Sequence, residues 1–300
     1  MTLKFGAVEG NGVVEVDYQR CAACGTCVKV CKGDQLTIEN GRLEVHPDNL
    51  FGCIACGHCV AACPQGAIQV HGRGMQAEDM VPIPPKEQRA TYDQFYNLAL
   101  ARRSVREFQD REVAPEVVQQ IIEAASTAPM GIPPTDVRVL VRNGFKEVHA
   151  LRDDLLAALR NWIKIFSPFM LTLMRPFMSK DDYNGMKTFV LPAIQAYDTY
   201  ERQGIDYFMY GAPLAMFFYS QNADQADPFI ASTYAMLAGE ALGLGTCMLG
   251  FPAYAFQYDK KLRARYGIRG KFQPGVMVIF GYPKVRYVKA IRRRFLEVRN

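Results

Sequence analysis

Eight of the nine cysteines in this 300-residue chain fall in two copies of one pattern. One copy runs from Cys21 to Cys31 and the other from Cys53 to Cys63, and both read C-x2-C-x2-C-x3-C. Four thiolates at this spacing are typical of iron–sulfur sites, and the repeated run is typical of paired [4Fe–4S] clusters. So small a region buries little apolar surface, so we expect bound clusters to supply much of its folding energy.

A pair of four-cysteine zinc sites is the competing interpretation of these residues. The interval within each run and the exact internal repeat favour iron–sulfur clusters. His58 lies inside the second run, and we interpret it as a bystander because cysteines already fill the four ligand positions. Cysteines used as metal ligands indicate a reducing compartment rather than an exported, disulfide-bonded protein.

Residues 10–71 resemble a bacterial two-cluster ferredoxin. The resemblance rests on the two runs, on Gly25 and Gly57 within their loops, and on Pro64 after the last cysteine. In such modules the fourth cysteine of each run binds the other cluster, and the clusters relay electrons singly. The resemblance therefore implies one cluster on Cys21, Cys24, Cys27 and Cys63, and a second on Cys53, Cys56, Cys59 and Cys31.

Composition and charge narrow the class of protein. The chain starts with no signal-peptide pattern, and its longest apolar run, residues 166–174, is too short to span a membrane, so we expect a cytoplasmic protein. Residues 260–300 carry thirteen Lys or Arg against one acid, Glu297. No aromatic-interleaved basic motif supports nucleic acid, so the tail favours a bound phosphate.

The order of expected elements predicts two domains. Strands flank the Asn40-Gly41 turn in the cysteine-rich part, and Gly and Pro residues indicate a linker over 73–90. Thr91 and Gln94 form a capping-box pattern that opens a helix. Helices over 145–165, 185–203 and 227–242 alternate with buried strands over 137–141, 213–219 and 275–282. We expect an α+β protein with a two-cluster domain (1–72), a linker (73–90) and a mixed domain (91–300).

Three features of the larger domain are each ambiguous alone. Arg102, Arg103, Ser104 and Arg106 could clamp a phosphate, but such clusters are more often a solvated helix end. Gly243 and Gly245 precede an apolar strand and could admit a flat ligand, or simply end a helix. A third group, residues 292–294, is three consecutive arginines near the C-terminus.

In this order the three features resemble the FMN-dependent nitroreductase family, an α/β-sandwich fold, over about residues 91–300. The resemblance implies a homodimer with flavin at the interface. Many members carry Asn-x-Gln-Pro-Trp where this chain has residues 129–136, so only backbone contacts are expected there. The implied flavin-binding residues are Arg102, Arg103, Ser104 and Arg106, the backbone of Pro129, Met130 and Gly131, Leu249 and Gly250 facing the ring, and Arg292 and Arg294 on the phosphate.

Together these patterns predict a flavin-based oxidoreductase in which no side chain acts as nucleophile or general base. We expect electrons to pass from the clusters to FMN and then to a small aromatic or conjugated acceptor. The expected donor is ferredoxin or another iron–sulfur protein, with NAD(P)H as the alternative. A non-catalytic electron carrier or redox sensor, dehalogenation, and flavin-modifying chemistry remain open. Cys247 has no cysteine partner and is interpreted as an inert buried thiol, with a redox role as the alternative.

Overall fold

A computed structural model describes residues 7–299 except 51, 222–223 and 271–272. The chain forms two compact units. The first comprises Met1–Ala90 together with Pro129–Val137 and Ser220–Asp227, and the second comprises Thr91–Ala128, Arg138–Tyr219 and Pro228–Asn300. Helices and strands are mixed along the chain, as expected of an α+β protein.

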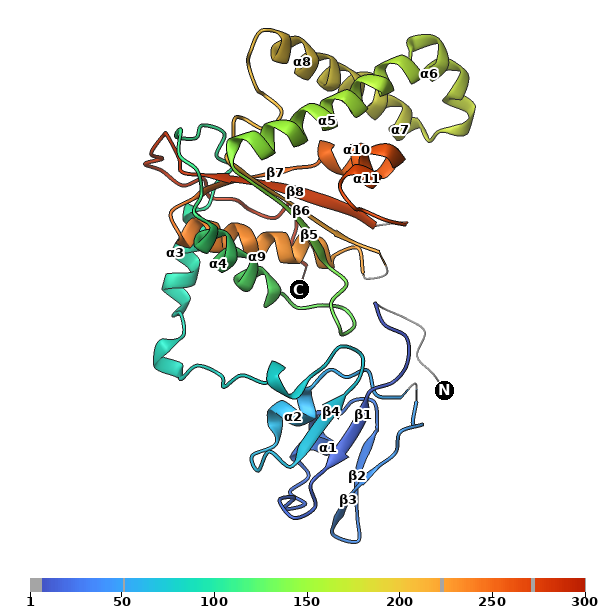
Figure 1. Cartoon of the computed structure of the whole chain (residues 1–300), viewed down its shortest axis with the longest axis vertical. Helices are drawn as coiled ribbons and strands as arrows, with labels where there is room; N and C mark the ends of the chain where they lie inside the picture. Colours follow the sequence, from blue (N-terminus) through green and yellow to red (C-terminus); the bar gives the residue numbers. More distant parts are fainter. Residues whose placement is uncertain (1–6, 51, 222–223, 271–272, 300) are drawn as a thin grey trace. The chain divides into compact units, whose positions relative to one another are not determined.

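Two short antiparallel strand pairs and two one-turn helices build the cysteine-rich part of the first unit (Figure 1). Strand β1 (Val13–Val16) pairs with β4 (Ile68–His71), and β2 (Leu36–Glu39) pairs with β3 (Arg42–Val45). The predicted β2–β3 hairpin is confirmed, because Asn40 and Gly41 have φ of 49° and 77°, the left-handed values that its two-residue turn requires. Helices α1 (Thr26–Val30) and α2 (His58–Ala62) each lie inside a cysteine run.

The core of this unit is small. Its larger buried aliphatic side chains are Leu36, Leu43, Ile68 and Val70, and Cys27 and Cys59 are buried among them. Beyond β4 follow two short 3-10 helices, η1 (Ala77–Asp79) and η2 (Lys86–Gln88).

A four-stranded sheet in the order β5-β6-β8-β7 is the centre of the second unit. The strands predicted over 137–141, 213–219 and 275–282 are confirmed as β5, β6 and β8 with small shifts of their ends. Strand β7 forms the edge beside β8 and pairs with it antiparallel. The bounds are Arg138–Asn143 for β5, Leu214–Ser220 for β6, Gly245–Leu249 for β7 and Gln273–Gly281 for β8.

Helices cover both faces of this sheet (Figure 1). On one face lie α5 (Phe145–Ile165) and α10 (Phe251–Tyr258), and on the other lie α4 (Pro115–Ser126) and α9 (Asp227–Ala241). Apolar side chains from the sheet meet those of α5 and α10 in the larger core. The remaining helices are α3 (Tyr92–Ala101), α6 (Pro168–Met174), η3 (Arg175–Phe177), α7 (Lys180–Gly185), the π-helical turn η4 (Met186–Val190), α8 (Leu191–Arg202) and α11 (Lys260–Arg265).

Local sequence signals explain where two of these helices begin. The hydroxyl of Thr91 accepts from the Gln94 amide, and the Gln94 side chain accepts from the Thr91 amide, so the predicted capping box is confirmed. Pro115 occupies the first turn of α4, where its missing N–H costs no helical hydrogen bond. The buried face of α4 carries Val118, Ile121 and Ala125, whereas Val117 is half-exposed.

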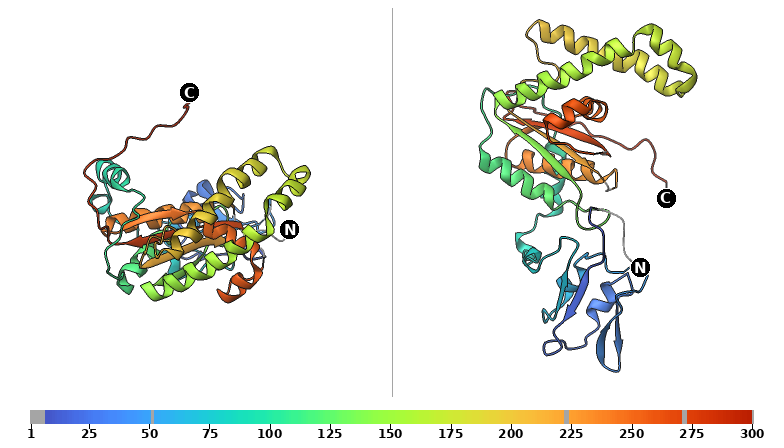
Figure 2. Two further views of the ribbon diagram at one scale, coloured as in Figure 1. Left: turned by 90° about the horizontal axis from the view of Figure 1, so that it is seen from above. Right: turned by 45° about the vertical axis from the view of Figure 1, so that its right-hand side comes forward.

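After β8 the chain continues to residue 299 without a helix or a paired strand, apart from a single bridge at Pro283 (Figure 2). Its beginning is fixed by backbone hydrogen bonds from Gln109 to Tyr282 and from Lys284 to Glu107. None of the helices that the structure describes is long and apolar enough to cross a membrane.

Candidate functional site

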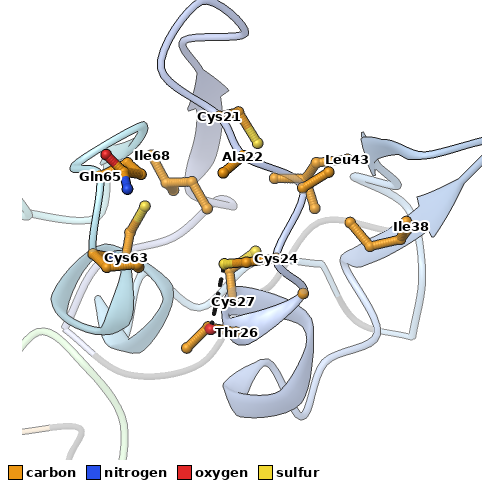
Figure 3. A pocket seen from close by; sticks show the side chains of 13 residues that line it. Cys21, Ala22, Cys24, Thr26, Cys27, Ile38, Leu43, Cys63, Gln65 and Ile68 are labelled. Carbon is orange, nitrogen blue, oxygen red and sulfur yellow. Dashed lines mark hydrogen bonds between the residues drawn. The ribbon is translucent and has the colours of Figure 1, made fainter.

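Cys21, Cys24, Cys27 and Cys63 line one pocket of the first unit, with apolar walls that include Ile38, Leu43 and Ile68 (Figure 3). Three of these cysteines come from the first run and one from the end of the second. The structure therefore brings together the four residues expected to share a cluster.

A second pocket is lined by the other four cysteines of the two runs, Cys31, Cys53, Cys56 and Cys59. The fourth cysteine of each run thus lies with the first three of the other run. This exchange follows from packing, because α1 and α2 contact each other and each ends at such a cysteine.

Glycines make the tight loops before α1 and α2 possible. Gly25 and Gly57 cap the two helices with φ of 71° and 74°, a conformation that a side chain would strain. A Cβ on Gly57 would also lie 2.2 Å from Cε of Met75 and 2.9 Å from Cε of Met80. Since each loop carries cysteines on both sides of its glycine, these glycines set the direction of the thiols.

The environment of the thiols suits sulfur that binds metal. Burial, reinforced by the neighbouring thiols, raises the pKa of Cys59 to about 12, so a free thiolate there is unfavourable without cations to offset its charge. Backbone amides of Ala55 and Ala67 donate to Cys53 Sγ and Cys63 Sγ at 3.4 and 3.2 Å. Such bonds stabilise negative charge on sulfur, so the donor set fits iron–sulfur clusters.

Each cysteine of a [4Fe–4S] cluster binds a different iron, so the four sulfurs surround a volume rather than a point. Among the residues that the structure describes, no three Cys, His, Asp or Glu side chains are grouped so as to hold a single metal ion. His58, interpreted from sequence as a bystander, places Nδ1 3.2 Å from Cys56 Sγ. It contacts a ligand sulfur without joining the set of four cysteines.

In the second unit, residues 104–106 form an extended strip against the edge strand β7. Ser104 bridges to Thr246, and the Val105 amide donates to the Thr246 carbonyl at 2.9 Å. Because side chains alternate along an extended chain, Val105 points into the core while Ser104 and Arg106 point the other way. The edge of the sheet therefore fixes the direction of the predicted phosphate-binding residues.

These residues open onto a pocket of ≈ 860 Å³ that α3, the strip and the C-terminal tail share. The tail reaches it through Tyr287, over whose ring the Arg103 guanidinium lies at 5.3 Å. Arg293 lines the pocket, whereas Arg294 does not. Five of the flavin-binding residues predicted from sequence line this pocket: Arg102, Arg103, Ser104, Arg106 and Arg292.

Charge in this pocket is strongly positive. Burial, together with repulsion from Arg293, lowers the pKa of Arg102. Glu240, on α9, is the nearby acid. Burial raises the pKa of Glu240, although the charges of Arg102 and Arg103 act to lower it. An anion placed among the arginines would offset their mutual repulsion, so the residues present fit the phosphate of a bound FMN.

Arg106 also borders a second, smaller pocket of ≈ 190 Å³. Leu249 and Gly250 form one side of it, and aromatic side chains of Tyr197, Phe208, Tyr210 and Phe251 form much of the rest. The Arg106 guanidinium lies 5.6 Å from the Tyr210 ring centroid. Tyr197 and Tyr210 were not predicted from sequence, because they lie in α8 and in a loop before β6, far along the chain from the strip.

Cys247 borders the same pocket but is only 1% exposed. Burial raises its pKa, so it is held as a neutral thiol and is a poor nucleophile. The structure favours the inert interpretation of this residue. Pro129, Met130 and Gly131 belong to the first unit, where the Gly131 amide faces both carboxylate oxygens of Asp227 at 3.2 and 3.3 Å.

Comparisons with known proteins match two families to the chain. Residues 15–68 match the 4Fe-4S dicluster domain, and residues 99–282 match the nitroreductase family. No curated protein matches the chain. Similar solved structures include a nitroreductase with bound FMN from Desulfitobacterium hafniense DCB-2, at 21% identity and a TM-score of 0.46, covering 68% of this chain and 98% of that one. An FMN-bound nitroreductase from Bacteroides fragilis NCTC 9343 shares 16% identity at a TM-score of 0.49, over 69% of this chain and 99% of that one.

The family match covers more than half of the chain, and the dicluster match precedes it without overlap. The protein therefore belongs to the nitroreductase family and carries a 4Fe–4S dicluster domain ahead of the nitroreductase domain.

Proposed function

We propose that the protein is an iron–sulfur flavoprotein oxidoreductase that passes electrons from two [4Fe–4S] clusters to FMN and on to a small aromatic or conjugated acceptor. The observation that carries this proposal is the presence, in one chain, of two four-cysteine pockets and an arginine-lined pocket beside an aromatic one. Membership of the nitroreductase family supports the choice of FMN.

In this proposal the side chains bind and orient the flavin rather than react with it. Arg102, Arg103, Ser104 and Arg292 hold the phosphate and ribityl chain, and Arg293 of the tail lines the same pocket. Arg106 lies near the pyrimidine edge, where its charge favours the anionic reduced ring. The backbones of Leu249 and Gly250 face the ring, as do those of Pro129, Met130 and Gly131. When bound, FMN supplies the conversion between single-electron input and two-electron output.

The acceptor binds in the smaller pocket. Tyr197, Phe208 and Tyr210 offer aromatic faces, and the two tyrosines add hydroxyl groups. Flat, conjugated molecules pack well against such walls, whereas a compact charged metabolite would leave the rings without contact. An aromatic or conjugated acceptor is therefore favoured.

The same proposal includes a cytoplasmic homodimer without a nucleic-acid partner. Helix α9 supports a second copy as partner, because Phe229 and Tyr234 expose 41% and 38% of their surface on a helix that is otherwise rich in small residues. A dicluster domain in the same chain favours ferredoxin or another iron–sulfur protein as electron donor over NAD(P)H.

An anaerobic titration of the purified protein tests the proposal. Flavin absorption bands and a broad cluster shoulder are expected, and reduced ferredoxin should bleach both. Rapid reduction by NADH without reduction by ferredoxin would contradict the proposed donor. A colourless protein containing zinc would contradict the whole scheme.

An acceptor screen separates the alternatives. Sustained turnover of nitroaromatics, quinones or activated alkenes supports the reductase, and the absence of any turnover supports an electron carrier. Release of halide from a halophenol, or fragmentation of excess reduced flavin, would replace reduction with dehalogenation or flavin-modifying chemistry.

A further inference from the structure

Arg73 links two distant parts of the chain inside the first unit. It is only 4% exposed, although it stands at the start of the segment predicted to be a linker. One guanidinium nitrogen, Nη1, donates to the carbonyls of Val8 and Gly10 at 2.6 and 2.8 Å. The other, Nη2, donates to the Pro133 carbonyl at 2.9 Å. A buried cation with three carbonyl acceptors is a specific contact, and its geometry requires the planar fork of arginine.

On one side of Arg73 lies the first cysteine of the second run. The Gly12 amide, two residues beyond Gly10, donates to the Cys53 carbonyl at 2.7 Å. A Cβ on Gly12 would stand 3.2 Å from Cys53 Sγ, so the backbone passes directly over the thiol. The segment that Arg73 holds thus packs against the pocket of Cys31, Cys53, Cys56 and Cys59 rather than against the other pocket.

On the other side lies segment 129–137, which joins α4 to β5. It is also bound to residues 220–227, because the Gln221 amide donates to Asp136 Oδ2 at 2.6 Å and Asp227 accepts from Gly131. Gly74, next to Arg73, approaches so closely that a Cβ would lie 3.3 Å from Cγ of Pro134. The segment belongs to the nitroreductase match in sequence but packs with the dicluster part in space.

We propose that Arg73 is a positioning residue that couples the cluster of Cys31, Cys53, Cys56 and Cys59, and not the other cluster, to the flavin-contacting segment 129–137. The proposal rests on the proposed function for the flavin contact, but the Arg73 contact itself does not. Coupling between two sites is reciprocal: flavin binding changes the free energy of cluster reduction by the same amount as cluster reduction changes the free energy of flavin binding. Flavin binding should therefore change the reduction potential of this one cluster, and loss of Arg73 should remove that effect.

Three variants separate the geometry of Arg73 from its charge. Arg73→Gln removes both the charge and the planar guanidinium. Arg73→Lys keeps the charge but lacks the two guanidinium nitrogens that reach separate carbonyl groups. The control is Arg20→Gln, because Arg20 is exposed and reaches Gly66 near the first pocket, where a Cβ would lie 3.1 Å from its Nη2. All three are made in the full-length protein, and iron content is measured first.

Amide hydrogen exchange tests the contact without reference to flavin chemistry. Arg73→Gln and Arg73→Lys should both speed exchange in residues 8–12 and 130–135, by roughly tenfold or more for the loss of charge-assisted bonds. The control should leave both regions unchanged. Unchanged exchange at residues 130–135 in both Arg73 variants would overturn the proposal, whether or not flavin is bound.

A redox titration followed by electron paramagnetic resonance, with and without FMN, tests the coupling. In the natural protein, flavin should shift one of the two cluster potentials. Arg73→Gln should lower that same potential, because a nearby positive charge favours the reduced cluster, and should abolish its response to flavin. Equal shifts of both potentials, or a flavin response that survives in Arg73→Gln, would overturn the proposal. Absence of flavin binding would instead contradict the proposed function and leave the exchange result to decide on Arg73.

Discussion

Val105 lies so close to Gly245 that a methyl group on the glycine would stand 2.6 Å from the valine Cβ. This contact holds the strip of residues 104–106 against β7. Gly245→Ala should therefore destabilise the protein by about 1–3 kcal/mol and displace Ser104 and Arg106. Thermal unfolding and flavin content measure the two effects.

Gly185→Ala is the matched control, since no atom lies within 4 Å of its added Cβ and its φ of −56° suits any residue. It should leave stability and flavin content nearly unchanged. Equal effects of the two substitutions would contradict the role assigned to the Val105 contact.

Arg102→Ala should lower the flavin content of the purified protein while leaving its iron content intact. The reason is that Arg102 lines the arginine pocket of the second unit, whereas the cysteines lie in the first. The ratio of flavin to iron, measured by absorption and metal analysis, checks the prediction. Arg202→Ala is a suitable control, because Arg202 is 74% exposed and its pair with Asp198 contributes little. Loss of iron along with flavin in Arg102→Ala would indicate general unfolding instead.

Substituting any one cysteine of the two runs should remove the cluster whose pocket it lines, and each pocket combines cysteines of both runs. Cys31→Ser and Cys53→Ser should each remove the same cluster and about half of the iron, since both residues line one pocket. The double variant Cys31→Ser/Cys53→Ser should lose no more iron than either single one. Iron analysis and electron paramagnetic resonance give the readout. Further loss in this double variant would mean that the two cysteines serve different clusters.

The pH dependence of the folding stability should reveal the contribution of the Asp154 carboxylate, which lies on α5. Burial opposes ionisation, but hydrogen bonds from Arg265 and from the Tyr266 hydroxyl at 2.7 Å lower the pKa of Asp154 below its ordinary 3.8. A depressed folded-state pKa contributes stability that is fully present above the unfolded-state pKa and is lost as the pH falls through the lower folded-state pKa. Asp154→Asn should thus be less stable at pH 7, by about 1 kcal/mol, with a deficit that shrinks as the pH falls below 3.8.

Chemical denaturation at several pH values measures that deficit, and comparison at equal pH cancels any cluster loss common to both proteins. Asp153→Asn is the neighbouring control, because Asp153 is 59% exposed and pairs only with the adjacent Arg152 in the contacts described. A deficit for Asp154→Asn that grows as the pH falls would reverse the expected sign.

The sequence predicted those parts of the fold whose signals are local. The Asn40-Gly41 turn, the capping box at Thr91 and the apolar run of β6 each depend on neighbouring residues, and each is confirmed. The exchange of Cys31 and Cys63 between pockets followed from a family resemblance, and the pockets have the same membership.

Contacts between distant segments had no comparable signal. Nothing in the pattern of residues 129–137 indicates that they pack with the dicluster part, because their partners Arg73, Gln221 and Asp227 lie about sixty and ninety residues away. Arg73 looked like part of a Gly-rich linker for the same reason. Tyr197 joins the smaller pocket from α8, which packs on α5, and Tyr210 joins it from the loop before β6, and periodicity encodes neither placement.

The composition of the first unit has a practical consequence for protein engineering. A dicluster domain excised after residue 72, or exchanged for another ferredoxin by a cut within 73–90, would be separated from the loop before β5 and the loop after β6. A cut after Arg73 would leave Pro133 behind on the recipient while Arg73 or its replacement travelled with the donor. Functional chimaeras of such fused proteins should therefore exchange three pieces of chain at once, not one.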